Sequence, residues 1–315
     1  MVLPRFGGPE LFEERDVPKP TPGPGELLVR VVVSGTNPVD AKIRQNGGWA
    51  GVTPPAIIGY DASGVVEGTG PGVTDLRAGD EVFFTPEIFG NPHGTYAEYT
   101  VVPAAIVAPK PRKLSHAAAA AFPLAAGTAW DALVRRLEVR PGETVLIHGG
   151  AGGVGTFAIQ LARVCGARVI ATAGTKNQAT LRELGADVCV DYTREDPAAV
   201  ALRETGNAGV DAVFSTVGGD TLAASIPATR PGGRLATILG ISGDLSAFYP
   251  RNQTLHGVFL TREGKRLREL AALVEQGKLT AVVDAVLPLA QVGEAHRRLD
   301  SGHGRGKIVL EVGEG

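Results

Sequence analysis

The sequence predicts an α/β protein that combines a small barrel-like β domain with a doubly wound parallel sheet. Residues 1–113 contain short β-branched runs between glycine and proline turns, which is typical of small β barrels. Residues 114–260 alternate short apolar strands with helical stretches, as in a parallel sheet covered on both faces. Residues 261–315 are too few for a domain, so we expect them to return to the first one. The length of 315 residues agrees with two domains.

In the first domain we expect short strands and no clear amphipathic helix between them. The first strand follows the turn-rich segment Pro22-Gly23-Pro24-Gly25. The predicted strands are residues 26–33, 62–67, 81–84 and 95–102.

In the second domain the apolar runs are short, and the segments between them have the spacing of helices. The predicted strands are residues 144–147, 168–173, 188–191, 210–216 and 234–239, with helices at 153–164 and 178–184. In the tail we expect helices at 264–275 and 292–299 and strands at 282–289 and 307–312.

Composition excludes several classes of protein. The net charge of −2 lacks the basic excess of proteins that bind nucleic acid. The longest uncharged run, residues 114–130, is alanine-rich and broken by Pro123, so we expect no membrane span. The start Met1–Arg5 lacks a secretory signal, and Cys165 and Cys189 cannot form a disulfide framework. We therefore expect a cytoplasmic protein.

A glycine-rich loop at residues 149–155 follows one predicted strand and opens the helix at 153–164. It contains Gly150-x-Gly152-x-x-Gly155, the dinucleotide-binding fingerprint. Glycines allow a sharp turn and let a diphosphate approach main-chain N–H groups at a helix N-terminus. The alternative is a turn needed only for tight packing, which explains Gly155 but not the whole cluster.

The end of the next predicted strand bears on coenzyme choice. NAD sites place a carboxylate there for the ribose 2′-hydroxyl. This chain has Thr172-Ala173-Gly174-Thr175-Lys176-Asn177, with hydroxyls and a lysine that favour a 2′-phosphate. We therefore predict NADPH rather than NADH. The alternative for Lys176 is an ordinary solvated surface lysine.

Many separate motifs resemble those of the medium-chain dehydrogenase/reductase superfamily, and within it the zinc-independent NADPH:quinone oxidoreductases that include zeta-crystallin. The motifs span nearly the whole chain: Phe6-Gly7-Gly8-Pro9-Glu10, Asn37-Pro38-Val39-Asp40, Gly59-Tyr60-Asp61 with Gly64-Val65-Val66-Glu67, Gly79-Asp80-Glu81-Val82, Gly94-Thr95-Tyr96-Ala97-Glu98-Tyr99, Ile147–Gly155, Leu184-Gly185-Ala186-Asp187 and Gly306-Lys307-Ile308-Val309-Leu310. The resemblance implies a GroES-like β domain, built from both chain ends, around a central Rossmann domain.

The resemblance also shows where this chain departs from zinc alcohol dehydrogenases. They place a cysteine at the position of Asn37 and a His-Glu pair at Tyr60-Asp61, and residues 85–94 lack their four structural cysteines. Amide and phenol groups cannot replace thiolate and imidazole on zinc. We therefore expect no metal, and an acceptor that attracts a hydride without a Lewis acid.

By the same resemblance, Asn37 and Tyr60 face the nicotinamide and the substrate, where they could hydrogen-bond the acceptor oxygen as charge develops. Alternatively, Asn37 organises its own turn and Tyr60 packs in the core. Asp40 matches a family position but could simply fix a helix start. Trp49 stands near the place where enoyl reductases carry a tyrosine acid, and an indole cannot supply that proton.

The resemblance implies a further set of residues on the coenzyme side. They are Thr128, Gly152, Gly153, Val154, Gly155, Thr172, Ala173, Lys176, Tyr192, Val217, Gly240, Ile241 and Phe259. Many relatives place the phosphate-binding lysine two positions later, where this chain has Gln178. We interpret His148, directly before the glycine loop, as a structural residue.

Three functions stay open from the sequence. The leading prediction is hydride transfer from NADPH to a quinone held against Asn37 and Tyr60. The closest alternative is NADPH-dependent reduction of an alkenal or enone, and a third is a non-catalytic NADPH-binding sensor or structural protein. The family also implies a homodimer, with a strand near 256–260 pairing across subunits, and a few more residues before Leu3.

Overall fold

The computed structural model describes residues 1–302 and 304–313 and divides the chain into two compact units. The split unit contains Met1–Gly127 and Arg262–Gly315, and the central unit contains Thr128–Thr261. From the sequence we expect the first domain to end at residue 113. The split unit extends further, to Gly127, because the helix that follows, α2 (His116–Ala120), packs on β1 and β2.

The split unit is built on a 7-stranded sheet to which both ends of the chain contribute. Its order is β12-β13-β1-β2-β3-β5, and β4 also pairs with β1. The last strand is antiparallel to the first, with Val33 opposite Glu311. The bounds are β1 Glu26–Gly35, β2 Ala62–Thr69, β3 Glu81–Phe84, β4 Tyr99–Pro103, β5 Val107–Pro109, β12 Val283–Pro288 and β13 Lys307–Glu311.

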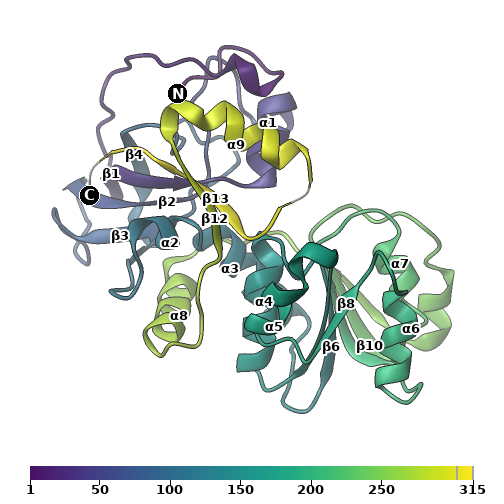
Figure 1. Ribbon diagram of the computed structural model, residues 1–315. Helices are drawn as coiled ribbons and strands as arrows, with labels where there is room; N and C mark the ends of the chain where they lie inside the picture. The colour runs from purple at the N-terminus through teal and green to yellow at the C-terminus, as the bar shows by residue number, and fades with distance from the viewer. Residues whose placement is uncertain (303, 314–315) are drawn as a thin grey trace. The chain divides into compact units, whose positions relative to one another are not determined.

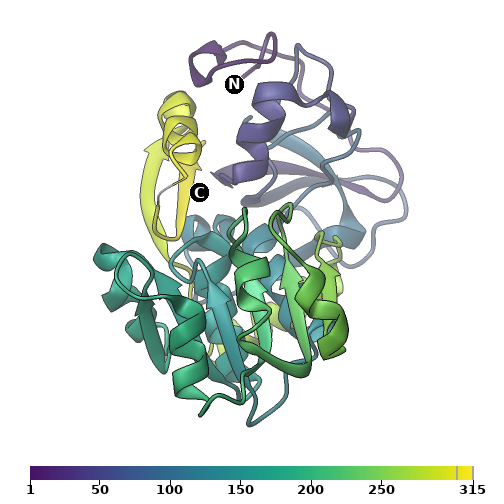
Figure 2. The ribbon, with the colours of Figure 1, turned by 90° about the vertical axis from the view of Figure 1, so that its right-hand side faces the viewer.

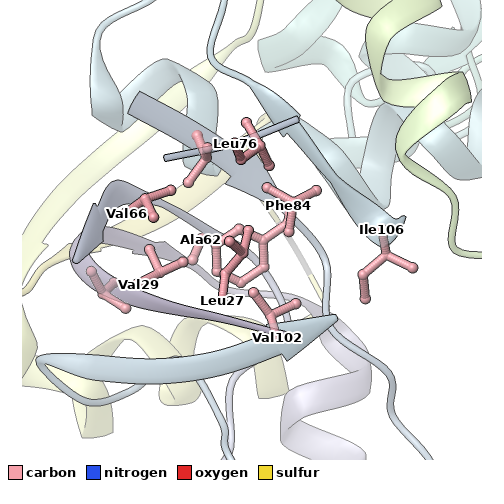
Figure 3. Close-up of a cluster of buried hydrophobic side chains, with 11 residues drawn as sticks. Leu27, Val29, Ala62, Val66, Leu76, Phe84, Val102 and Ile106 are labelled. Atoms are coloured by element: carbon pink, nitrogen blue, oxygen red, sulfur yellow. The ribbon is translucent and has the colours of Figure 1, made fainter. Parts of the chain in front are cut away.

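Inward-facing side chains of these strands form a compact apolar core. Figure 3 shows Leu27 and Val29 of β1 directed toward Val66 of β2 and Phe84 of β3. Alternate residues of a strand point to the same face, so β-branched runs such as 26–33 place one side chain in two in this core. This burial holds the strands that carry Asn37 and Tyr60 at their ends.

The helices of the split unit are α1 (Pro38–Asn46), α2, α8 (Gly264–Glu275), α9 (Val292–Asp300) and the first part of α3 (Pro123–Trp130). Among them, α2 packs on the central strands β1 and β2, α8 packs beside β5, and α9 packs beside β12 and β13. The yellow C-terminal strands and α9 lie together in Figure 2, in agreement with the predicted return of the tail.

The central unit is a 6-stranded parallel sheet with the order β11-β10-β9-β6-β7-β8. Strand order reverses at β6, whose neighbours are β9 and β7, and doubly wound folds bind ligands at such a point. The strands are β6 Thr144–His148, β7 Arg168–Ala173, β8 Val188–Asp191, β9 Val210–Ser215, β10 Thr229–Thr237 and β11 Thr254–Gly257.

Helices cover both faces of this parallel sheet, with α4 and α5 on one side and α6 and α7 on the other (Figure 1). They span α4 Gly153–Val164, α5 Gln178–Glu183, α6 Pro197–Glu204 and α7 Thr221–Ser225. Both the doubly wound sheet and the α/β class are therefore confirmed. Among the described residues, no helix combines the length and the apolar character needed to cross a membrane.

Three local predictions were wrong. Helix α1 interrupts the first domain, where no helix was expected, because Pro38 suits the first helical turn and Asn37 N donates to Asp40 Oδ2 at 2.8 Å. The predicted strand at 95–102 begins only at Tyr99. The strand predicted at 234–239 begins earlier, at Thr229, and ends at Thr237.

Candidate active site

The glycine-rich loop joins the end of β6 to the start of α4, and its backbone leaves no room for side chains at two positions. Gly149 has a φ of +74°, and a Cβ atom on it would lie 2.4 Å from Thr216 Oγ1. A Cβ atom on Gly155 would lie 2.0 Å from the carbonyl oxygen of Gly149. These two glycines therefore allow α4 to begin directly behind the strand end.

At the mouth of the loop the same backbone is open. Gly152 precedes the first helical residue, has no side chain to cap the helix, and a Cβ atom on it would meet only Gly149 O, at 3.4 Å. The amides of Gly153, Val154 and Gly155 occupy the first turn of α4, where helix geometry gives N–H groups no partner. The loop thus fits an approaching diphosphate.

Two threonines from neighbouring strands brace this loop. Thr172, at the end of β7, accepts a hydrogen bond from Gly150 N through its carbonyl (2.8 Å) and from Gly149 N through its hydroxyl (3.3 Å). Thr216, after β9, donates its hydroxyl to the carbonyl oxygen of His148 at 2.9 Å. The buried hydroxyl of Thr172 is therefore engaged by the loop itself.

His148 is buried at the strand end and behaves as a structural residue. Its Nε2 lies 2.8 Å from Ser225 Oγ, and the Ser225 hydroxyl in turn donates to Thr221 O. Burial lowers the pKa of His148 to about 4. The ring therefore adds no charge behind the loop near neutral pH.

The segment directly after β7 presents the cation of Lys176. Lys176 is exposed, and within residues 1–302 and 304–313 its ammonium has no hydrogen-bond or ion-pair partner. Gln178, two positions later, donates to Ala173 O (2.8 Å) and Val190 O (3.2 Å). Gln178 therefore ties two strand ends together, and Lys176 is the basic group nearest to the end of β7.

The structure adds a carboxylate that sequence reasoning missed. Asp191 ends β8 and is paired in register with Ala173, so it stands beside the segment that lacked an acid. It accepts hydrogen bonds from the hydroxyls of Thr175 (2.5 Å) and Thr193 (2.6 Å), and these bonds lower its pKa. The Arg194 guanidinium lies 3.5 Å from it.

The remaining coenzyme-side predictions lie in the central unit. Val217, Gly240 with Ile241, and Phe259 each follow the carboxyl end of a strand and are exposed, and Gly219 forms a parallel bridge with Ile241. Tyr192 is exposed after β8, whereas Thr128 is buried on α3.

In the split unit, Asn37 lies in a buried polar cluster. The residue is 2% exposed, and its Nδ2 donates to Asp61 Oδ2 at 2.9 Å. Lys307 donates to Asn37 Oδ1, to Thr36 O at 2.6 Å, and to Asp61 Oδ2 at 3.2 Å. Burial raises the pKa of Asp61, and the Lys307 ammonium opposes that rise. The ammonium fixes which way the Asn37 amide points, because only the amide oxygen can accept from it.

Tyr60 precedes Asp61 and is 1% exposed. Its hydroxyl differs from the polar groups of Asn37, Asp61 and Lys307 in its hydrogen bonding. Its carbonyl accepts from Thr85 Oγ1 at 2.6 Å, while in the described part of the chain its own hydroxyl makes no hydrogen bond. Burial raises the pKa of Tyr60, and the charge of Asp40 adds to the rise. The phenol therefore keeps its proton and can donate it in a hydrogen bond.

A second polar chain anchors α1. Tyr96 donates its hydroxyl to Asp40 Oδ2 at 2.8 Å, and His296 Nε2 lies 3.1 Å from the same hydroxyl. Burial raises the pKa of Asp40 to about 7 and lowers that of His296 to about 3. Asp40 also accepts from Asn37 N, which matches the interpretation that it fixes a helix start.

Comparison with known proteins agrees with this architecture. Residues 23–112 match the family described as alcohol dehydrogenase GroES-like domain, and residues 184–310 match zinc-binding dehydrogenase. The NADPH-dependent alkenal/one oxidoreductase of Arabidopsis thaliana chloroplasts is 35% identical, over 97% of this chain and 77% of its own. Human quinone oxidoreductase is 31% identical, over 97% of this chain and 95% of its own.

The chain belongs to the zeta-crystallin-like quinone oxidoreductase family of the medium-chain dehydrogenase/reductase superfamily. The recognition of this family from sequence motifs is confirmed, and the protein is an oxidoreductase.

Solved structures resemble the whole chain. One described as an NAD-dependent alcohol dehydrogenase has a TM-score of 0.92 and 38% identity, covering 99% of both chains. A mycobacterial protein complexed with NADPH has a TM-score of 0.87 and 33% identity, covering 99% of this chain and 98% of its own. The split unit therefore has the GroES-like fold, and the central unit has the Rossmann fold.

One matching family is described as zinc-binding, but the residues of this chain do not fit zinc. The donor set at the expected positions is an amide, a phenol and a carboxylate, and Lys307 already occupies the Asn37 and Asp61 oxygens. No group of three or more histidine, cysteine, aspartate or glutamate side chains is placed to hold a metal among the residues described. A thiolate or imidazole ligand is what a protein zinc site requires.

Proposed function

We propose that this chain transfers a hydride from NADPH to a quinone or a similarly conjugated acceptor without a zinc ion. When bound, NADPH supplies the hydride. The first turn of α4 would hold its diphosphate, and the strand ends of the central unit would hold its nucleoside groups. Relatives named quinone oxidoreductase and NADPH-dependent alkenal/one oxidoreductase support both the reaction class and the coenzyme.

The free hydroxyl of Tyr60 is the observation that carries the acceptor part of this proposal. A hydroxyl that the protein leaves without a partner stays available to donate to a ligand. A phenol that keeps its proton can donate to an acceptor oxygen as negative charge develops there. This supplies, through a side chain, part of the stabilisation that zinc supplies in the alcohol dehydrogenases.

Asn37 can contribute a second donor. Its Nδ2 carries two hydrogens, and only the bond to Asp61 is made within the described chain. The Lys307 ammonium on Oδ1 polarises the amide and strengthens its remaining N–H as a donor. Asn37 would therefore orient the acceptor beside Tyr60 rather than exchange protons with it.

The choice of NADPH rests on Lys176, an exposed cation without a described partner close after β7. Asp191 nearby opposes a 2′-phosphate, but Thr175, Thr193 and Arg194 already engage its charge. A lysine beside hydroxyls then favours the phosphate over a bare ribose hydroxyl.

An alkenal or enone is the second candidate acceptor, because a relative at 35% identity bears that name. Initial rates of NADPH oxidation with 1,4-naphthoquinone and with trans-2-hexenal separate the two. A quinone rate above the enzyme-free control supports the proposal. A rate only with the alkenal selects the alternative, and tight NADPH binding without oxidation by any acceptor selects a sensor.

We further propose a cytoplasmic homodimer that takes small-molecule acceptors and binds neither nucleic acid nor membranes. Strand β11 lies at the edge of the central sheet, and Phe259 just after it is exposed. Unpaired edges of this kind can join a second copy. Light scattering that gives the monomer mass at micromolar concentration would overturn the dimer.

A further inference from the structure

Two large aromatic side chains of the split unit, Trp49 and Phe89, are exposed and contact each other. Trp49 lies in the short 3₁₀ helix Gly48–Ala50, and Phe89 lies between β3 and β4. Their exposures are 49% and 53%, their ring centroids are 6.0 Å apart, and their planes meet at 80°. Exposed aromatic rings in contact with each other offer apolar surface on which a flat ligand can bind.

The backbone holds this pair in place. Gly90 N donates to Ala50 O at 2.9 Å, so the two segments are joined beside the rings. Gly90 adopts a φ of +64° for this approach, a conformation that glycine accepts readily. Ala50 and Ile88, the chain neighbours of the two aromatic residues, are buried in one apolar cluster that also contains Tyr60.

The same segment connects the aromatic pair to the candidate acceptor site. Thr85 donates its hydroxyl to Tyr60 O, and Arg262 Nε donates to Pro86 O at 2.7 Å. Residues 85–90 therefore run from the backbone of Tyr60 to the ring of Phe89, tied at both ends. The aromatic pair and the backbone of Tyr60 therefore belong to one connected part of the split unit.

We propose that Trp49 and Phe89 form an aromatic wall that binds the ring of a planar quinone and so favours ring acceptors over open-chain alkenals. This deepens the proposed function and rests on it. An edge-to-face pair offers a π face to a flat conjugated ring, and indole is the most electron-rich such face in proteins. A straight-chain alkenal has a π face only at its conjugated end, so it gains less from the wall.

Kinetics of Phe89 variants test the wall. Phe89→Ala should raise the KM for 1,4-naphthoquinone about three- to tenfold and change the KM for trans-2-hexenal less than about twofold. Phe89→Leu keeps apolar bulk without a ring and should behave like Phe89→Ala. Tyr249→Ala, at a tyrosine of the central unit that is 83% exposed, is the matched control and should change neither KM.

A binding measurement separates failure of the wall from failure of the reaction. The chain has two tryptophans, so Trp130→Phe leaves Trp49 as the only indole emitter. With NADP⁺ present and no turnover, 1,4-naphthoquinone should quench Trp49 saturably, beyond its quenching of free N-acetyltryptophanamide, and Phe89→Leu should weaken this binding. Saturable quenching without turnover would refute only the proposed function. Turnover with unchanged quinone KM and quenching in the Phe89 variants, or an equal loss for both acceptors, would overturn the wall.

Discussion

Tyr60 is set apart from the polar residues around it by its unpaired hydroxyl. Asn37, Asp61 and Lys307 bond to one another, whereas the Tyr60 hydroxyl has no bond in the described chain. Tyr60→Phe should therefore lower kcat about 10²-fold or more, as loss of one donor to a developing oxyanion does, and leave stability nearly unchanged.

Steady-state kinetics with naphthoquinone measure kcat, and a thermal melt measures stability. Tyr249→Phe removes an exposed hydroxyl and should leave kcat and the melting temperature unchanged. If Tyr60→Phe kept wild-type kcat, the phenol would be a packing residue, as the alternative interpretation of the sequence holds.

Lys176 is the residue on which coenzyme selection depends. Lys176→Ala should weaken NADPH binding about tenfold, because one charge-assisted contact to phosphate is lost, and should leave NADH binding within about twofold. Calorimetric titration with both coenzymes measures the difference, and Lys278→Ala, at an exposed lysine after α8, is the control. An equal loss for the two coenzymes would contradict a 2′-phosphate contact.

The titration of Asp40 makes the free energy of unfolding depend on pH, and Asp40→Asn removes this dependence. Burial raises its pKa from 3.8 to about 7, so the folded protein keeps a proton that the unfolded chain releases between these values. Wild-type stability therefore falls as pH rises through this window. Asp40→Asn does not titrate, so its stability relative to wild type should improve from pH 5 to pH 7.5, by at most about 2.7 kcal/mol. Urea unfolding at both pH values measures this, and a pH-independent difference would refute the shift.

At the scale of elements, the β6–α4 loop separates a folding role of glycine from a ligand role. Gly155→Ala places a methyl group on Gly149 O and should lower both the melting temperature and NADPH affinity. In Gly152→Ala the protein has space for the added methyl group, so the melting temperature should not change. The binding of NADPH should become weaker, because the methyl group stands where a diphosphate approaches. If Gly152→Ala bound NADPH as wild type does, the diphosphate would lie elsewhere.

Elements with a strong local signal were predicted from the sequence almost to the residue. Helix α4 and strands β7 and β8 have their predicted bounds, because apolar periodicity and the glycine loop define them locally. Helix α1 was missed, since its start depends on a hydrogen bond between Asn37 and Asp40 rather than on an apolar stripe.

The site residues, too, could be predicted where the local sequence defines them and not where distant contacts do. The glycine loop could be predicted from its own sequence. The partners of Asn37 could not, because Lys307 reaches it from the other end of the chain. Asp191 comes beside Ala173 only through sheet register, which composition does not specify.

For the molecule as a whole, Lys307 joins the two separated parts of the split unit. Lys307→Met leaves Asp61 as a buried carboxylate without its cation and should destabilise the fold by about 3–5 kcal/mol. Adding Asp61→Asn removes the unpaired charge and should recover a large part of this loss. Chemical denaturation of the single variant and of the double variant measures this recovery. If the two variants had the same free energy of unfolding, the Lys307–Asp61 pair would contribute no ion-pair energy.

The pairing of β13 with β1 has a consequence for biosynthesis. A ribosome delivers the central unit as one uninterrupted stretch, so that unit can fold while synthesis continues. The opening strands leave the exit tunnel early, and β1 can pair there with β2 and β4, but its last residues, Val33–Gly35, must wait for β13, which is synthesised after the whole central unit. Nascent chains of this protein therefore elongate through the whole central unit with this part of the β1 edge uncovered.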